Sequence, residues 1–173
     1  MDSVSTHSHS IVVEQAGRAT DIEYRWAGSS QPQAPVMVFL HEGLGSVSLW
    51  KDFPDRLCEQ LGMRGLVYSR PGYGRSTPRA QDEHWTPDFM HRQAREVLPA
   101  LLDKLGIVRP WLFGHSDGGS IALLYAALFP SSPAGAIVVA PHIFVEDISI
   151  ASIAQARGAY LGFLKFPIIP HRL

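Results

Sequence analysis

The chain has 173 residues, 46% hydrophobic and 18% charged, and a mean hydropathy near zero, so its composition excludes a disordered chain and a membrane protein. The 15 Lys and Arg residues nearly balance the 16 Asp and Glu residues, which argues against a nucleic-acid partner because such binding depends on neutralising phosphates. The single cysteine, Cys58, excludes an intramolecular disulfide and a multi-cysteine zinc site.

The length fits one domain of about 150 residues. The first ten residues have no basic or apolar stretch of the kind that a secretory signal needs, and no apolar run reaches the roughly 18 residues of a membrane span. We therefore expect a soluble cytoplasmic protein without a membrane partner. Residues 1–9 are rich in Ser, Thr and His, and this favours a flexible tail over a metal site at His7 and His9.

The first third of the chain predicts strands and one helix. Ile11–Glu14 and Asp21–Trp26 alternate in part and predict two antiparallel strands at a sheet edge, and residues 29–35 predict a loop. The continuous apolar run Pro35–Leu40 is typical of a strand in a parallel sheet that helices cover on both faces. Apolar residues at helical spacing over Leu49–Leu61 predict a helix with Pro54 in its first turn.

The remaining elements alternate between strands and helices. Strands are predicted at 66–68, 110–113 and 136–140, and helices at 121–129 and from Thr86-Pro87-Asp88 to about Leu105, where Gly106 follows. This order predicts an α/β fold with a mostly parallel sheet, helices on both faces and right-handed crossovers.

The strongest chemical motif is Gly114-His-Ser-Asp-Gly118, which fits G-x-S-x-G. It comes directly after a predicted buried strand and directly before a helix, where a sharp turn presents the serine hydroxyl and small neighbours avoid clashes. We interpret Ser116 as a nucleophile, the alternative being a tight turn of purely structural use.

A second glycine-rich segment, His41-Glu-Gly-Leu-Gly-Ser46, follows the predicted strand 35–40. Acyl transfer needs backbone N–H donors for the developing oxyanion, and we expect one from Asp117 and one from this loop, at Gly43 or its neighbour Leu44. A glycine-rich turn without catalytic use is the alternative. A phosphate loop and a dinucleotide fingerprint fit poorly, because no Gly-Lys-Ser/Thr follows and G-x-G-x-x-G is incomplete.

A third segment, Ser69-Arg-Pro-Gly-Tyr-Gly-Arg-Ser76, follows the predicted strand 66–68. It predicts a tight, positively charged turn in which Arg70 or Arg75 pairs with a carboxylate. Neither arginine is predicted to be catalytic.

In this order, the three motifs resemble the α/β-hydrolase superfamily over roughly residues 11–147. The resemblance implies an H-G-x-x-G-like oxyanion loop at His41–Gly45, an R-x-G-Y-G-x-S turn at Arg70–Ser76 and a nucleophile elbow at Ser116. It also implies that His115 packs on the oxyanion side. Glu42 departs from the family's usual glycine and would disturb the loop's electrostatics unless its side chain points away or is paired.

The resemblance implies a triad of Ser, acid and His in chain order. Few acids and histidines follow Ser116 in this sequence, so the candidates for its two partners are few. Asp147 and His171 satisfy the order and are weak candidates, while Asp117 is expected to face away from the triad position. His142 is predicted to line the pocket rather than act as the base. His84 and His91, which precede the nucleophile, are expected to be solvated.

The last 13 residues break the alternation, since Leu161–Leu173 is apolar and twice interrupted by proline. We predict a flexible tail at 1–9, a partial hydrolase core at 10–147, and the start of a cap or an aberrant tail at 148–173. The fold would then be incomplete at the C-terminus through truncation or a shifted reading frame, and residues 136–140 would form an exposed sheet edge that permits self-association.

These observations favour a serine hydrolase that acts on an ester or a similar small carbonyl substrate, with no metal or organic cofactor. The alternative is a catalytically silent fragment or pseudoenzyme that serves as a binding module, and a third possibility is another chemistry on the same scaffold, such as a cofactor-free haloperoxidase or a C–C bond hydrolase. His41, His115 and His142 are the predicted pocket residues. Trp50, Trp85 and Phe144 fit either a pocket wall or core packing.

Overall fold

The computed structural model describes residues 8–163 except 16, 81 and 83. Contacts divide the chain into two compact units, residues 1–142 and residues 143–173. The predicted tail at residues 1–9 lies mostly outside the described residues, and so does most of the aberrant segment after Leu161. Among the helices of the described part, none is long and apolar enough to cross a membrane.

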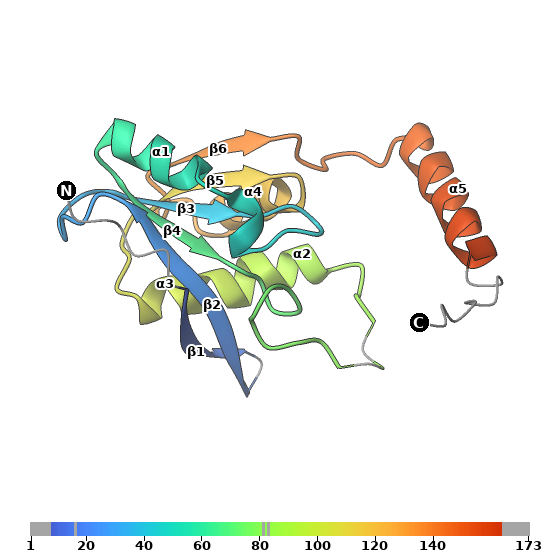
Figure 1. Cartoon of the computed structure of the whole chain (residues 1–173), viewed down its shortest axis with the longest axis horizontal. Helices are drawn as coiled ribbons and strands as arrows, with labels where there is room; N and C mark the ends of the chain where they lie inside the picture. Colours follow the sequence, from blue (N-terminus) through green and yellow to red (C-terminus); the bar gives the residue numbers. More distant parts are fainter. Residues whose placement is uncertain (1–7, 16, 81, 83, 164–173) are drawn as a thin grey trace, which may run out of the picture. The chain divides into compact units, whose positions relative to one another are not determined.

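The first unit is built on a six-stranded sheet, shown in Figure 1, with the strand order β1-β2-β4-β3-β5-β6. The strands are β1 (His9–Gln15), β2 (Arg18–Gly28), β3 (Val36–Leu40), β4 (Arg64–Tyr68), β5 (Trp111–His115) and β6 (Gly135–Val139). β1 and β2 pair in antiparallel fashion, β2 pairs antiparallel with β4, and the other neighbours are parallel. The predicted fold class is confirmed.

Alternate residues of β3 build two separate cores, one on each face of the sheet. Val38 and Leu40 pack in a cluster with residues of the helices after β4 and β5. Met37 and Phe39 pack with Cys58 and its neighbours on the other face. Burial, and then the nearby Asp55, raise the pKa of the Cys58 thiol to about 11, so this free cysteine is a protonated core residue at neutral pH.

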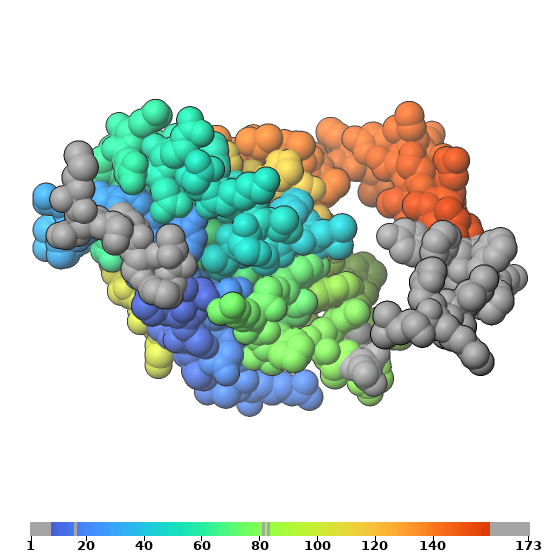
Figure 2. All heavy atoms as spheres, in the orientation of Figure 1, coloured from blue at the N-terminus to red at the C-terminus, as the bar shows by residue number. Residues whose placement is uncertain are grey.

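The segment after β3 is helical in two pieces rather than one. A 3₁₀ turn, η1 (Val47–Trp50), precedes α1 (Phe53–Leu61), and Lys51 between them has a φ of 50°. Pro54 occupies the first turn of α1, where its missing N–H has no intrahelical acceptor to lose. The atoms of α1, in teal in Figure 2, lie on the surface of this unit.

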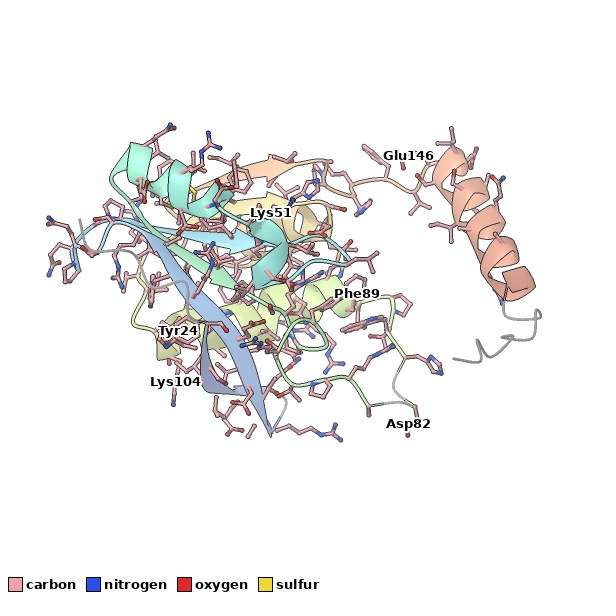
Figure 3. All side chains as sticks on the ribbon, viewed as in Figure 1. Tyr24, Lys51, Asp82, Phe89, Lys104 and Glu146 are labelled. Carbon is pink, nitrogen blue, oxygen red and sulfur yellow. The ribbon has the colours of Figure 1, made fainter. Side chains whose placement is uncertain are left out.

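The helix predicted from residue 86 begins at Phe89 and contains an unpredicted change of geometry. It runs as α2 (Phe89–Arg92), a π-helical stretch η2 (Gln93–Val97) and α3 (Leu98–Lys104); Figure 3 labels Phe89 and Lys104 at its two ends. Pro99 has no N–H to donate to the carbonyl group four residues earlier, and in a regular α-helix the proline ring would collide with that carbonyl group. The wider π turn directly before α3 accommodates the proline.

The last helix of the first unit, α4 (Asp117–Leu128), packs against β3, β5 and β6. In the second unit, α5 (Asp147–Phe163) carries the exposed apolar residues Ile148, Ile150 and Ile153. The contact boundary after His142 precedes the predicted core boundary at residue 147.

Candidate active site

Ser116 lies in a tight turn between the end of β5 and the start of α4. Its φ of 53° and ψ of −118° belong to a region that residues with a side chain rarely occupy. A Cβ atom on Gly114 would overlap the backbone of Gly118, and one on Gly118 would overlap the carbonyl group of Leu40. The two glycines therefore let β5 and α4 meet closely enough to hold the serine in this conformation.

The loop after β3 lies beside this turn because β3 and β5 are neighbours in the sheet. A Cβ atom on Gly43 would lie 3.1 Å from a carboxylate oxygen of Asp117. Gly45 donates its N–H to the carbonyl of Glu42 at 3.1 Å, and Leu44 is 87% exposed. The structure thus brings Ser116, Asp117 and the predicted donor loop to one place.

Glu42 uses its backbone and its side chain differently. Its carbonyl oxygen also accepts a hydrogen bond from an Arg70 NH₂ group at 2.9 Å and lies 2.7 Å from Nδ1 of His41. Its carboxylate lies against Gly45, where a Cβ atom would overlap it. The departure from glycine at position 42 therefore adds a carboxylate on the Gly45 side of the loop.

His41 is fully buried and its two ring nitrogens have different partners. Nε2 accepts the backbone N–H of Arg70 at 3.0 Å, which leaves Nδ1 as the protonated nitrogen that donates to Glu42. Burial, and then the positive charge of Arg70, lower the pKa of His41 from 6.5 to about 3. His41 is therefore a neutral residue that joins the loop to the turn after β4.

Arg70 is only 1% exposed and pairs with Asp117, the residue after Ser116. Its guanidinium lies 3.5 Å from Oδ2 of Asp117, whose side chain is 15% exposed. It therefore offsets a negative charge that lies beside the predicted oxyanion donors. The prediction that Arg70 or Arg75 pairs with a carboxylate is confirmed for Arg70.

His142 is closer to Ser116 than the sequence predicted for a residue of the pocket wall. Its Nε2 lies 2.9 Å from Oγ of Ser116 and 3.6 Å from Oδ1 of Asp117. The order of the strands could have predicted this contact. Parallel β5 and β6 end side by side; Ser116 directly follows β5, and His142 follows β6 after two intervening residues.

The other predicted site residues are not brought to Ser116. His84 and His91 are exposed, as expected, and His115 is exposed at the end of β5. Asp147 is the first residue of α5 in the second unit, and His171 lies outside the described residues, so the Asp147–His171 pair stays a prediction. The described residues contain no cluster of three or more His, Cys, Asp or Glu that could hold a metal ion.

The three aromatic pocket candidates have different surroundings. Trp50 packs against Phe39 and Phe113 in the core on the α1 face. Trp85 stacks on Tyr73 and lines a cavity of about 540 Å³ between the β1–β2 turn and the start of α2, whose lining does not include Ser116. Phe144 is 77% exposed in the second unit. Trp50 is therefore a core residue.

Comparison with known proteins gives consistent results. The model of the alpha/beta hydrolase fold family matches residues 35–160. The chain is 28% identical over 141 residues to an sn-1-specific diacylglycerol lipase of Mus musculus and 31% identical over 102 residues to a proline iminopeptidase of Lactiplantibacillus plantarum. A carboxylesterase structure from the thaumarchaeon Nitrososphaera gargenis has a TM-score of 0.71 at 21% identity, which shows similarity of fold.

The similar proteins are longer than this chain. The alignment with the lipase covers 80% of this chain and 41% of the lipase, and that with the iminopeptidase covers 59% and 34%. The carboxylesterase superposition covers 87% of this chain and 53% of the esterase. The chain thus spans less than half the length of these two curated relatives.

Proposed function

Because the chain belongs to the alpha/beta hydrolase fold family, we propose that it carries the nucleophilic half of a serine hydrolase site, with Ser116 as the nucleophile. The substrate is a carboxylic ester or a similar small carbonyl compound. Ser116 Oγ attacks the carbonyl carbon and forms an acyl-enzyme, which water then hydrolyses. This chemistry needs no metal ion and no organic cofactor.

The observation that carries the proposal is the backbone conformation of Ser116. A non-glycine residue held at a φ of 53° costs on the order of 1–3 kcal/mol, and such strain persists where the surrounding structure enforces it. Here the close packing of Gly114 and Gly118 enforces it. The strained turn keeps the hydroxyl at the end of the sheet, where a substrate can reach it.

Backbone donors next to Ser116 support acyl transfer. Asp117 is the first residue of α4, so its N–H has no intrahelical acceptor and is available to an oxyanion. Gly43, or its neighbour Leu44, supplies the second donor from the adjoining loop. The positive end of α4 favours the same developing negative charge.

We choose an ester as the substrate because its leaving group makes a small demand on acid catalysis, and because of the names of similar proteins. An ester expels an alcohol, which is a better leaving group than an amine, so it makes the smaller demand on acid catalysis. One curated relative is named a lipase, and the name of one structure of the same fold mentions carboxylesterases. We therefore propose esters, rather than peptides, as the substrates.

A fluorophosphonate probe tests the nucleophile directly, because Ser116 Oγ displaces fluoride and stays covalently labelled. We expect the protein to gain the mass of one probe less HF, and Ser116→Ala to gain none. Ser30→Ala, which alters an exposed loop serine, is the matched control and should label like the wild type. A panel of p-nitrophenyl esters and anilides then ranks the substrate classes.

Folded protein that gains no probe mass contradicts the proposal and supports the catalytically silent binding module. Labelling that persists in Ser116→Ala also contradicts it, because another nucleophile would then react. Circular dichroism of each variant establishes that the comparison is made between folded proteins.

A further inference from the structure

The backbone of His142 is fixed to the first turn of α4. Its N–H donates to Oγ of Ser120 at 2.8 Å, and Ser120 Oγ donates to the carbonyl of His142 at 3.0 Å. Ser120 is buried and lies one helical turn after Ser116, so the residue that holds the His142 backbone and the residue that lies beside its imidazole belong to one continuous segment. The position of His142 beside Ser116 is therefore determined by hydrogen bonds as well as by the end of β6.

We propose that His142 is the proton acceptor for Ser116 in this chain, so that the two residues form a catalytic dyad. The inference rests on the proposed function of Ser116 and adds the identity of its base. Its basis is the 2.9 Å separation between Ser116 Oγ and His142 Nε2, which is within the range for direct proton transfer. A pocket-wall residue would need no such contact with the hydroxyl.

The charges around the imidazole favour the protonated product of that transfer. Oδ1 of Asp117 lies 3.6 Å from Nε2, so a carboxylate is already in place when the imidazole becomes positive. The other oxygen of Asp117 is 3.5 Å from Arg70, which holds the carboxylate between the two cations. Ser116 and Asp117 lie beside the imidazole, Arg70 is connected to it through Asp117, and Ser120 binds the backbone of His142.

This arrangement differs from a Ser–His–acid triad. In a triad, the acid accepts a hydrogen bond from Nδ1 and so leaves the lone pair of Nε2 for the serine. Here the carboxylate lies on the Nε2 side, next to the serine itself. Asp117 can stabilise the imidazolium electrostatically, but it does not select the tautomer in which Nε2 accepts a proton. We therefore expect a slower base than a full triad provides.

Over one turnover, each proton that His142 accepts is returned to a leaving group. As Ser116 Oγ bonds to the carbonyl carbon, its proton moves to His142 Nε2 and the carbonyl electron pair moves to oxygen. Collapse of this intermediate breaks the bond to the alcohol, which takes the proton from Nε2. Water then repeats the sequence against the acyl group, and the acid leaves with Ser116 and His142 restored.

The side chain of His142 is 56% exposed, which gives the test a means of chemical rescue. Free imidazole can occupy the space that His142→Ala opens and accept the serine proton from solution. A role in packing alone would not be restored by a small base.

The experiment measures the second-order rate of labelling by the fluorophosphonate probe as a function of pH. We expect His142→Gln to lower the rate by about 100-fold or more, the usual contribution of general-base catalysis, and to remove the rise of the rate with pH. His142→Ala should show the same loss and regain at least part of the rate with added imidazole. His91→Gln, which replaces an exposed histidine on α2, is the matched control and should leave both the rate and the profile unchanged.

The outcomes separate this inference from the proposed function. Labelling of Ser116 at the wild-type rate and with the wild-type pH profile in both His142 variants overturns the dyad and leaves the nucleophile intact. Wild-type protein that does not label at all overturns both. Because His142 is more than half exposed, its variants should fold, and their melting curves check this; if His142→Gln does not fold, His142→Ala with imidazole decides the question.

Discussion

The residues next to the Ser116 turn form a buried polar network in which Arg70 contacts each of the other members. Arg70 donates its backbone N–H to His41 and its side chain to the carbonyl of Glu42, and it pairs with Asp117. Each of these partners belongs to a segment of the candidate site. A single buried guanidinium thus ties the donor loop and the start of α4 to the turn after β4.

The lowered pKa of His41 makes a prediction about stability. The histidine binds a proton near pH 6.5 in the unfolded chain and near pH 3 in the folded protein, so the unfolded state holds more protons between these values. The free energy of unfolding should therefore fall as pH drops through this window, by up to about 1.4 kcal/mol per pH unit from this residue, and this contribution is fully retained above pH 6.5.

Urea unfolding of wild type and His41→Gln across that pH window measures the effect. Glutamine keeps a donor and an acceptor at the site but does not titrate there, so its stability should depend less steeply on pH. His91→Gln is the control, and its slope should follow that of the wild type. Equal slopes for wild type and His41→Gln would show that His41 protonates alike in both states.

At the scale of elements, the close approach of α4 to β3 and β5 depends on small residues. A Cβ atom on Gly118 would overlap the carbonyl of Leu40, and that atom is backbone, so it cannot rotate away. We expect Gly118→Ala to lower the free energy of unfolding by roughly 3 kcal/mol or more, as overpacking against an unyielding neighbour does, and to abolish labelling of Ser116.

The matched control for that substitution is Gly158→Ala, also a glycine-to-alanine change within a helix. A Cβ atom at Gly158 in α5 meets nothing within 4 Å, and alanine is favoured over glycine in a helix by about 1 kcal/mol. Helical content, measured by circular dichroism, should therefore stay the same or rise. A Gly118→Ala protein as stable as the wild type would refute the packing argument.

The sequence predicts an element well where its own residues determine the element. The apolar run ending at Leu40 and the Gly114–Gly118 turn contain their own signals, of strand length and of small residues at a sharp bend. The π-helical stretch before Pro99 was missed: Pro99 lies inside the predicted helix of residues 86–105, where a proline removes a backbone hydrogen bond, but the sequence alone does not say which form the disturbance takes. The His142 contact was missed because the spatial neighbourhood of β5 and β6 sets it, and no local pattern encodes it.

At the scale of the whole molecule, the sheet has two edges of different character within the described part of the chain. β1 closes one edge as part of an antiparallel hairpin, and β6 ends the parallel part and pairs with β5. Ile137 and Val139 of β6 are 42% and 44% exposed, although parallel strands are ordinarily covered on both faces. The candidate site lies at the C-terminal end of this strand, and His142 follows the strand after two residues.

An open strand with apolar side chains presents unpaired backbone groups to another chain, so we predict that the protein self-associates through β6. Sedimentation velocity over a range of concentrations should show oligomers that dissociate on dilution. Ile137→Lys should weaken the association about 10-fold or more, equivalent to about 1.4 kcal/mol, because a charge on the edge opposes pairing. Val12→Lys places the same charge at a 46% exposed position of β1 on the opposite edge and should leave the association unchanged. A protein that stays monomeric at all concentrations, or equal effects of the two lysines, would contradict pairing through β6, since only one of the substitutions alters that edge.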